Sequence, residues 1–499
     1  MITLLKTEKF QKIHTLSRCV FLCLFTFYLI LREVTALDPY IDNLYVTALF
    51  LVGSTFFVGI DFLTNRYLFK TKYVTVAIVF LVFTIVSCII NVKYGFFSNL
   101  KGLAAFFIYL FLLYPEALKD NDNRNLYACF STALFTISFF ALISIPMYLF
   151  NICYIFSDGH TQGFSIDIMR LWGFFHDPNY VSLYIIICGF LSILLFKKTN
   201  SIIKRIFIVT ANIINFIHFT LAGSRMGKLA LILGIFWLLA VIFFKFIKTK
   251  IYVRIFGFLG ASILSVLVIY GSITGIELGL PMVKKHILNT ASYETYVNVH
   301  KLYDKLFEND YFEITSGLTS EAIQEDYKNN GIQKVERLDN HGDISNGRLT
   351  RWLDSIKIIS KNPLFGTSPR NIFAFAKEFA TETLMAQNDF YIHNTYLEIL
   401  AGGGIIGATT ILCFLILAAI CVIKSTMVLP TNLKTAVCSS IVLIIAFSAF
   451  LLPDIIFFQT TFSGFTFWTV LGYCLNVDNE EYKNSWTNRL IKKCFKKGK

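Results

Sequence analysis

A histidine beside the start of an apolar run is the residue of this sequence best suited to accept a proton. His393 and Asn394 precede the run, and Glu398 lies in its first turn. The positive end of a helix dipole disfavours a protonated imidazole, so a histidine at this place is expected to be neutral and able to act as a base. The alternative interpretation is a structural histidine that only makes hydrogen bonds.

Arginines in two other segments suit the binding of a phosphate group. Arg225 follows Gly223 and Ser224 in a tight connection between two apolar runs, and Arg348 and Arg351 begin a further segment. A guanidinium group is always charged and presents a planar fork of donors that matches phosphate oxygens. For Arg225 alone, a side chain that merely reaches toward the membrane surface is the commoner outcome.

A third segment, residues 170–179, combines charged and aromatic residues just before another apolar run. Arg170 and His176 are candidates for substrate binding, while Asp177 is placed to cap a helix that has Pro178 in its first turn. On the chemistry of these residues alone, an aromatic belt at a membrane interface beside a capped helix is the favoured interpretation.

The composition places all three segments in a membrane protein. The 499 residues are 55% hydrophobic and only 15% charged, which excludes a water-soluble globule with a polar shell. A helix needs about 20 mostly apolar residues to cross roughly 30 Å of hydrocarbon. The fold class predicted is therefore an all-α polytopic membrane protein with about twelve transmembrane helices. The apolar runs are 19–31, 44–63, 73–91, 99–114, 127–150, 178–196, 202–222, 227–244, 252–272, 396–423, 434–452 and 455–474.

The placement of lysine and arginine predicts the orientation of these helices. With the N-terminus inside, the cytoplasmic segments hold 26 of the 45 basic residues, the short outer segments hold six, and a long outer loop holds 13. Cytoplasmic loops carry the excess of basic residues in membrane proteins. We therefore expect both termini in the cytoplasm and the candidate segments on the outer face. The formal net charge of +13 then reports topology and not a nucleic-acid partner.

One membrane domain with an inserted loop region is the predicted organisation. Two stretches of the loop, 296–307 and 349–359, have apolar residues at helical spacing, which predicts two amphipathic helices. These helices form either a lid over an outward-facing site or a solvated cap. Gly403 and Gly407 are expected to let a neighbouring helix approach closely. The predicted parts are helices 1–9 in 1–272, the extracytoplasmic loop region 273–392, helices 10–12 in 393–475 and a basic cytoplasmic tail 476–499.

In these motifs and their order, the sequence resembles the O-antigen ligase and polysaccharide polymerase family of bacterial membrane glycosyltransferases. The resemblance covers roughly residues 165–425. It depends on the 170–179 segment, on Gly223-Ser224-Arg225, on Arg348 to Trp352 with the 362–366 sequence NPLFG, and on His393-Asn394 with Glu398 and the glycine-rich helix. It implies a GT-C-like fold, an undecaprenyl-pyrophosphate-linked glycan donor, a hydroxyl acceptor and no metal or other cofactor.

The resemblance also implies roles for individual residues. Arg225 and Arg348 match the arginines that hold the donor pyrophosphate, with Arg351 as an alternative to Arg348, and His393 matches the general base. Further candidates for substrate binding are Arg170, His176, Asn394 and Glu398.

Polymerisation of lipid-linked repeat units into O-antigen or capsular polysaccharide is the function expected first. Ligation of the glycan to lipid A core or another terminal acceptor is the nearest rival, because it needs the same donor machinery. A transporter or flippase of lipid-linked sugar is a third candidate function, and a non-catalytic assembly partner is a fourth. The expected partners are the lipid-linked donor, a glycan or lipid-linked acceptor, membrane lipids and a chain-length regulator, in the inner membrane of a bacterium.

Overall fold

The structure is a computed structural model, and its apolar helices match the predicted membrane spans. In the part of the chain that it describes, nine helices are long and apolar enough to cross a membrane, and three shorter apolar helices complete the set. The prediction of about twelve spans in a nearly all-α protein is confirmed. The described residues are 7–41, 44–64, 70–120, 122–156, 161–165, 169–307, 314–316, 347–388, 390–428 and 432–475, so the predicted tail 476–499 lies outside them.

The twelve helices form one bundle, and their ends follow from local sequence signals. Asp177, for example, caps α9 by accepting a hydrogen bond from the backbone N–H of Asn179, and Pro178 begins that helix. The helices are α2 (Glu8–Leu31), α4 (Leu44–Thr64), α6 (Val74–Ile90), α7 (Phe96–Phe107), α8 (Arg124–Leu149), α9 (Pro178–Lys198), α10 (Ile202–Ala222), α11 (Arg225–Val241), α12 (Ile251–Thr290), α18 (Thr395–Ile423), α19 (Leu433–Ser448) and α20 (Phe462–Leu475).

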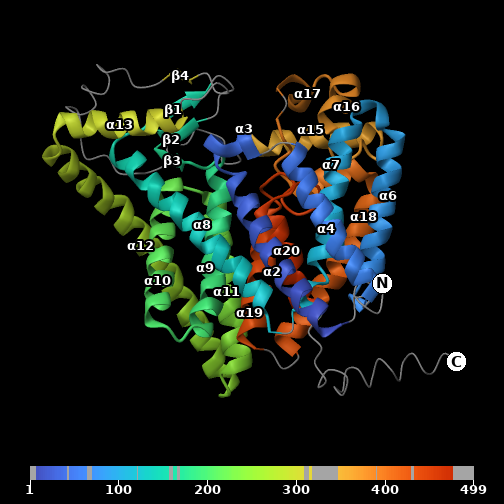
Figure 1. The fold of residues 1–499 in the computed structure, drawn as a ribbon, viewed down its shortest axis with the longest axis horizontal. Helices are drawn as coiled ribbons and strands as arrows, with labels where there is room; N and C mark the ends of the chain where they lie inside the picture. The colour runs from blue at the N-terminus through green and yellow to red at the C-terminus, as the bar shows by residue number, and fades with distance from the viewer. Residues whose placement is uncertain are drawn as a thin grey trace.

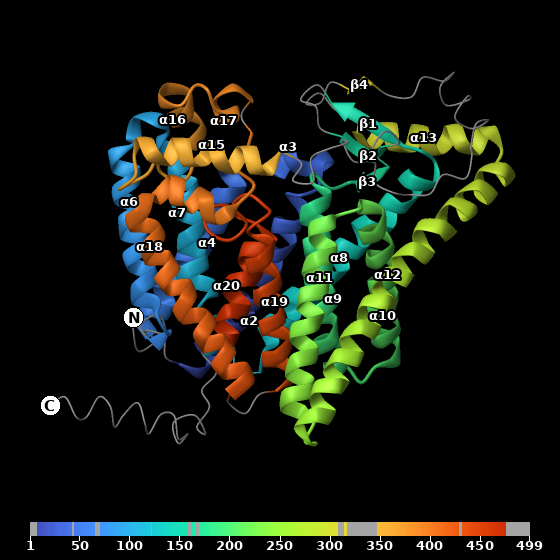
Figure 2. The same cartoon turned by 180° about the vertical axis from the view of Figure 1, so that it is seen from behind.

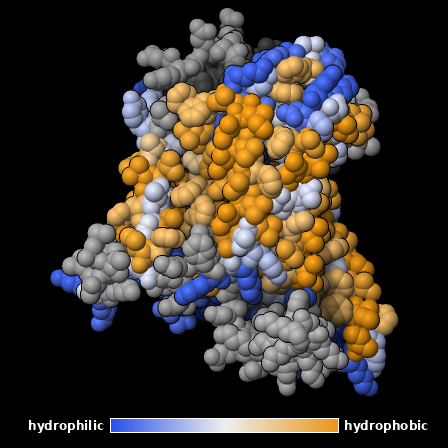
Figure 3. All heavy atoms as spheres, turned by 90° about the vertical axis from the view of Figure 1, so that its right-hand side faces the viewer, coloured by the Kyte–Doolittle hydropathy of each residue, from blue (hydrophilic) through white to orange (hydrophobic). Residues whose placement is uncertain are grey.

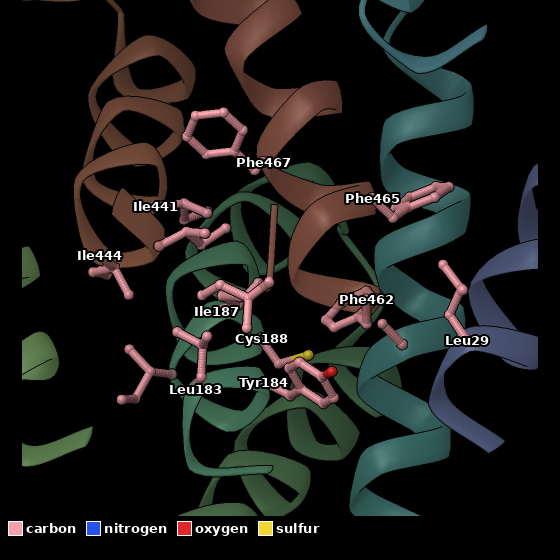
Figure 4. Packing of buried hydrophobic residues seen from close by; sticks show 14 of the residues in the cluster. Leu29, Leu183, Tyr184, Ile187, Cys188, Ile441, Ile444, Phe462, Phe465 and Phe467 are labelled. Atoms are coloured by element: carbon pink, nitrogen blue, oxygen red, sulfur yellow. The ribbon is translucent and has the colours of Figure 1, made fainter. Parts of the chain in front are cut away.

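Apolar side chains cover the middle of the bundle and also fill its centre. Figure 3 shows a broad hydrophobic band on one face, with hydrophilic residues gathered above it. Inside, Tyr184 and Cys188 of α9 pack toward Phe462 of α20 and Leu29 of α2 (Figure 4). A bundle that is apolar both inside and outside is stable only with lipid around it, so the chain is a multi-pass membrane protein.

One end of the bundle carries short elements that do not cross it, and we call it the cap end. Helices α13 and α15 lie across this end, beside a small sheet and the short helices α16 and α17 (Figure 1). The cap elements are α3 (Asp38–Ile41), β1 (Cys153–Phe156), β2 (Thr161–Ser165), β3 (Arg170–Gly173), α13 (Tyr293–Phe307), β4 (Ile314–Ser316), α15 (Arg348–Lys361), α16 (Ile372–Phe379) and α17 (Leu384–Asn388).

The sheet is a departure from the predicted all-α fold. Its strands are antiparallel in the order β3-β2-β1-β4, with Tyr154 opposite Gln162 and Ser165 opposite Arg170. The strands are three to five residues long, which is too short for a clear period-two pattern to appear in the sequence. The sheet places Arg170 on a strand, where a loop was expected.

Helix α12 is longer than the predicted ninth span. It continues from Ile251 to Thr290, with Pro281 inside it, whereas the apolar run ended at 272. Figure 2 shows α12 leaning away from α10 and α11 toward the cap end, where α13 turns back over the sheet. The two predicted amphipathic helices correspond to α13 and α15.

The segment 449–461 between α19 and α20 is not helical, although the last predicted span began at 455. Its backbone is held by side chains: the Asp454 carboxylate accepts hydrogen bonds from the N–H groups of Phe457 and Phe458, at 2.9 and 2.6 Å. The carboxylate of Glu398 in turn accepts from the Asp454 N–H at 2.7 Å. Irregular backbone at this depth requires such partners, and it lines a cavity here.

A break in α18 adds a requirement for glycine that was not predicted. Gly404 has φ 62° and ψ −173°, a conformation that is essentially restricted to glycine. The loop after α15 enters at this break, where the N–H of Ile405 donates to the Pro363 carbonyl at 2.8 Å. A Cβ on Gly404 would lie 2.3 Å from the Leu364 carbonyl oxygen. The close approach at Gly404 is therefore made by a loop, whereas a Cβ on Gly407 would lie 3.8 Å from Phe80 of the neighbouring helix α6.

Replacing Gly404 with alanine is expected to destabilise the protein by about 1–3 kcal/mol from backbone strain, in addition to the clash with Leu364. Gly403→Ala is the matched control, because its nearest contact would be 4.0 Å away, and we expect a change within about 0.5 kcal/mol. The measurement is the thermal unfolding midpoint of both variants in the same detergent. Equal midpoints would show that the break does not require glycine.

A buried ion cluster near the opposite end of the bundle was not predicted. Arg18 of α2 contacts Asp61 of α4 at 2.8 Å and Glu116 at 2.6 Å, and Lys119 pairs with Asp61. Two cations and two carboxylates balance, and Asn125 donates a further hydrogen bond to Glu116. Buried charges that are paired and hydrogen-bonded in this way hold helices in register.

Candidate functional site

A polar cavity of about 610 Å³ lies at the cap end, between the sheet, the start of α9 and the 449–461 segment. It collects residues from parts of the chain that are far apart in sequence. Its lining residues are Arg32, Glu33, Thr47, Lys101, Thr161, Arg170, Trp172, His176, Asp177, Pro178, Asn179, Tyr180, Arg370, Tyr391, His393, Pro453, Phe458, Gln459, Thr460 and Thr461.

His393 contributes an imidazole to this wall from just before α18. Its φ of 53° is left-handed, which is uncommon for a residue other than glycine and occurs often at functional sites. Nδ1 is buried and has no hydrogen-bond partner among the described residues. Asn394 then caps α18, since its side-chain oxygen accepts from the N–H groups of Tyr396 and Leu397. The cap and the backbone turn together fix where the imidazole projects.

The surroundings of His393 keep it neutral. Burial and then the positive charge of Arg351 lower its pKa to about 4, with Asp177 acting in the opposite direction and Arg348 lowering it further. A neutral imidazole was predicted from the helix dipole. The structure supplies different causes for it, namely desolvation and two arginines of α15.

Arg348 and Arg351 lie on the first turn of α15, which packs against α18. The guanidinium of Arg351 is 4.8 Å from the centre of the Phe390 ring, and its Nε is buried without a hydrogen-bond partner among the described residues. Burial lowers the pKa of Arg351. A desolvated donor beside a base is suited to an anionic ligand.

Arg225 is connected to the cavity wall through a short network. It begins α11, exposed, directly after Ser224. The hydroxyl of Ser224 donates to the side-chain oxygen of Asn179 at 3.0 Å, and Arg170 donates to the same oxygen at 2.8 Å. Arg170 also donates from Nε to the Ala222 carbonyl at 2.7 Å. The segments 170–179 and 223–225, predicted separately, are therefore joined.

His176 lies in the cavity wall next to Glu33, which follows α2. Its backbone N–H donates to the Glu33 carbonyl at 2.8 Å, and the Glu33 carboxylate accepts from the Tyr184 hydroxyl at 3.0 Å. Glu398, a candidate for substrate binding, anchors Asp454 instead of lining the cavity. The contacts of Asn394 and Glu398 are thus those of a helix cap and a loop anchor.

The structure brings three of the eight predicted residues into the cavity wall and two more close enough to act on one of them. His393, Arg170 and His176 line the cavity, and Arg348 and Arg351 act electrostatically on His393. Within the described part of the chain, Arg225, Arg348 and Arg351 are not in the cavity wall itself. The basic residues of the wall and the arginines of α15 are therefore two distinct sets: His393 lines the cavity with the first and interacts electrostatically with the second.

Three basic residues of the wall were missed: Arg32, Lys101 and Arg370. Arg32 and Lys101 belong to the small set of basic residues in short outer segments, which runs against the charge bias used to orient the helices. Their unusual position in outer segments could have identified these two residues as candidates. Arg370 had none, because it is one basic residue among 13 in the long loop.

The site offers a base and cations but no metal-ligand set. In the described ranges no three His, Cys, Asp or Glu side chains gather as ligands for a metal ion. A neutral imidazole next to fixed guanidinium groups can take a proton from a hydroxyl while the arginines stabilise developing negative charge.

One of the comparisons with known proteins finds a similar family. A family model described as O-antigen ligase matches residues 210–412, a range that contains Arg225, α15 and His393. The predicted family resemblance is thereby confirmed. Comparison with curated proteins finds no match.

Proposed function

We propose that the protein transfers a glycan from a polyprenyl-pyrophosphate carrier to a sugar hydroxyl. The premise is the similarity of residues 210–412 to the O-antigen ligase family. The observation that carries the proposal is the position of His393, a half-buried neutral imidazole in the wall of a polar cavity and near two arginines. The enzyme is a membrane glycosyltransferase with a GT-C-like fold, and it requires no metal ion.

The proposed donor site lies at α15 and Arg225. Breaking the glycosyl-pyrophosphate bond leaves negative charge on the pyrophosphate, which the guanidinium groups of Arg351, Arg348 and Arg225 stabilise. The acceptor hydroxyl gives its proton to His393 as its oxygen attacks the anomeric carbon. Bound pyrophosphate also offsets the charge of the arginines, and this raises the pKa of His393 and makes it a stronger base.

Polymerisation of undecaprenyl-pyrophosphate-linked repeat units is the reaction we propose first. Ligation to lipid A core or another terminal acceptor is the second candidate. The description of the matching family, O-antigen ligase, supports it. The test is surface polysaccharide from cells that depend on this chain, run as a ladder on a gel. Inactivation that leaves single repeats on the core identifies a polymerase, whereas lipid-linked polymer with bare core identifies a ligase.

We further propose that the cap end faces away from the cytoplasm in a bacterial inner membrane, with both termini in the cytoplasm. The distribution of basic residues supports this orientation. Reporter fusions at residue 499 and within the 273–392 loop test it, and the two fusions should report opposite sides. A chain-length regulator is the protein partner we expect.

The pH dependence of transfer follows from the pKa of His393. A general base must be neutral, so kcat/KM should stay level as the pH falls from 7 and then drop through about 4, where the free imidazole becomes protonated. The inflection in kcat should lie higher, because bound pyrophosphate favours the protonated imidazole. A transfer assay at constant ionic strength measures both profiles. An inflection of kcat/KM at the ordinary value of 6.5 would contradict the buried position.

A further inference from the structure

Two basic side chains of the cavity wall have no partner among the residues that the structure describes. Lys101 of α7 and Arg370 are both exposed, and neither side chain makes a hydrogen bond or ion pair within those described residues. Both line the same cavity, and the side-chain stem of Arg370 packs against Gly102, the residue that follows Lys101. Two cations that line one cavity favour an anionic ligand in it.

The carboxylates around this wall are already engaged. Glu33 accepts from Tyr184, and Asp177 caps α9. Behind the wall, Asp454 and Glu398 act electrostatically on Arg370, but both accept backbone N–H groups and neither carboxylate lines the cavity with it. The cavity surface itself therefore carries four cations, Arg32, Lys101, Arg170 and Arg370, against two carboxylates.

We infer that Lys101 and Arg370 bind a negatively charged group, a carboxylate or a phosphate, on the saccharide acceptor in this cavity. The inference rests on the proposed transferase function and adds the charge of the acceptor to it. The donor pyrophosphate is assigned to the arginines of α15 and to Arg225, which leaves this wall for the second substrate. The cavity of about 610 Å³ is in the range of small-ligand sites, and its lining includes the aromatic residues Trp172 and Tyr391.

The position of His393 supports this division of the site. The imidazole lines the cavity, so an acceptor held there presents its hydroxyl to the base. Arg348 and Arg351 approach the same imidazole from α15. An acceptor anchored by its anionic group at Lys101 and Arg370 would thus meet the donor at His393, with each substrate on its own basic region.

The test measures binding to the full chain in lipid nanodiscs with three probes. These are cellobiose, cellobiouronic acid and glucose 6-phosphate, which differ in charge and in the source of that charge. We expect the native protein to bind at least one acidic probe about tenfold or more tightly than cellobiose, with the preference weakening as salt is raised. The double variant Lys101→Gln/Arg370→Gln should lose the preference. Tighter binding of the carboxylate or of the phosphate identifies the group.

Matched variants separate the outcomes. Lys93→Gln removes an exposed basic residue near the same end that pairs with Glu378 and lies outside the cavity wall, so the preference should remain. Lys101→Arg/Arg370→Lys keeps both charges and should also retain it. His393→Ala should keep acidic-probe binding even though transfer is lost, so failure of the catalytic proposal is distinguishable. Equal binding of neutral and acidic probes by the native protein, or the same loss in Lys93→Gln, would overturn the inference.

Discussion

Replacing His393 with alanine should lower the rate of glycan transfer by about 10²- to 10⁴-fold, the usual contribution of a general base. The imidazole lines the cavity, and its Nδ1 has no hydrogen-bond partner in the described structure. Its removal therefore takes away the proton acceptor without breaking a structural contact of that atom. The loss should be in kcat, because the base acts on the transition state and not on ground-state binding.

The matched control for His393→Ala is His176→Ala, which removes the other imidazole of the same wall. Nothing in its geometry assigns it the proton, so we expect a much smaller loss. Both variants are compared at equal protein level by the length distribution of the surface polysaccharide and by transfer in vitro. A well-expressed His393→Ala protein that still makes long polymer at the native rate would eliminate the assignment of the base.

Replacing Arg351 with glutamine should reduce transfer by about 10²- to 10³-fold, comparable to the removal of one donor from a site that stabilises transition-state charge. Its guanidinium is partly desolvated over Phe390 and lowers the pKa of His393. The variant should therefore lose stabilisation of the leaving pyrophosphate. The pH at which kcat/KM falls should also rise, because a positive neighbour that disfavours the imidazolium has gone.

This second readout distinguishes a donor-binding residue from a structural one. Lys357→Gln is the control, since Lys357 lies on the same helix, is exposed and pairs with Asp354. It should change neither rate nor pH profile. Arg348→Gln, measured alongside, ranks the two arginines that the sequence could not separate. An Arg351→Gln protein with native kcat and an unchanged pH profile would remove Arg351 from the donor site.

Much of the fold was predictable because hydrophobic length is a local property. Each apolar run needs no knowledge of its neighbours to be identified as a span, and Asp177-Pro178 marks the start of α9 in the sequence itself. The exceptions depend on contacts between distant residues. The segment 449–461 is as apolar as a helix, and side-chain hydrogen bonds, among them those of Asp454 and Glu398, hold it in a non-helical conformation.

The candidate site divides in the same way. His393, Arg225 and Arg351 were identified as candidates because their types and neighbours form recognisable motifs, and their roles stay predictions. Arg370 could not, since it becomes relevant only when the chain brings it to the cavity. The buried group of Arg18, Asp61 and Glu116 was missed for a similar reason: its members come from three separate segments. The chemical properties of each side chain can be predicted from the sequence, but which distant side chains meet in the fold cannot.

The break in α18 has a mechanical consequence. The loop that follows α15 is hydrogen-bonded into that break, with Thr367 and Ser368 donating to the carbonyls of Ala401 and Gly402 at 2.8 Å. These hydrogen bonds connect α15, which carries Arg348 and Arg351, to α18, which His393 precedes. Movements of the other cap elements would change how substrates enter the cavity, but they would leave the distance between the arginines of α15 and His393 unchanged.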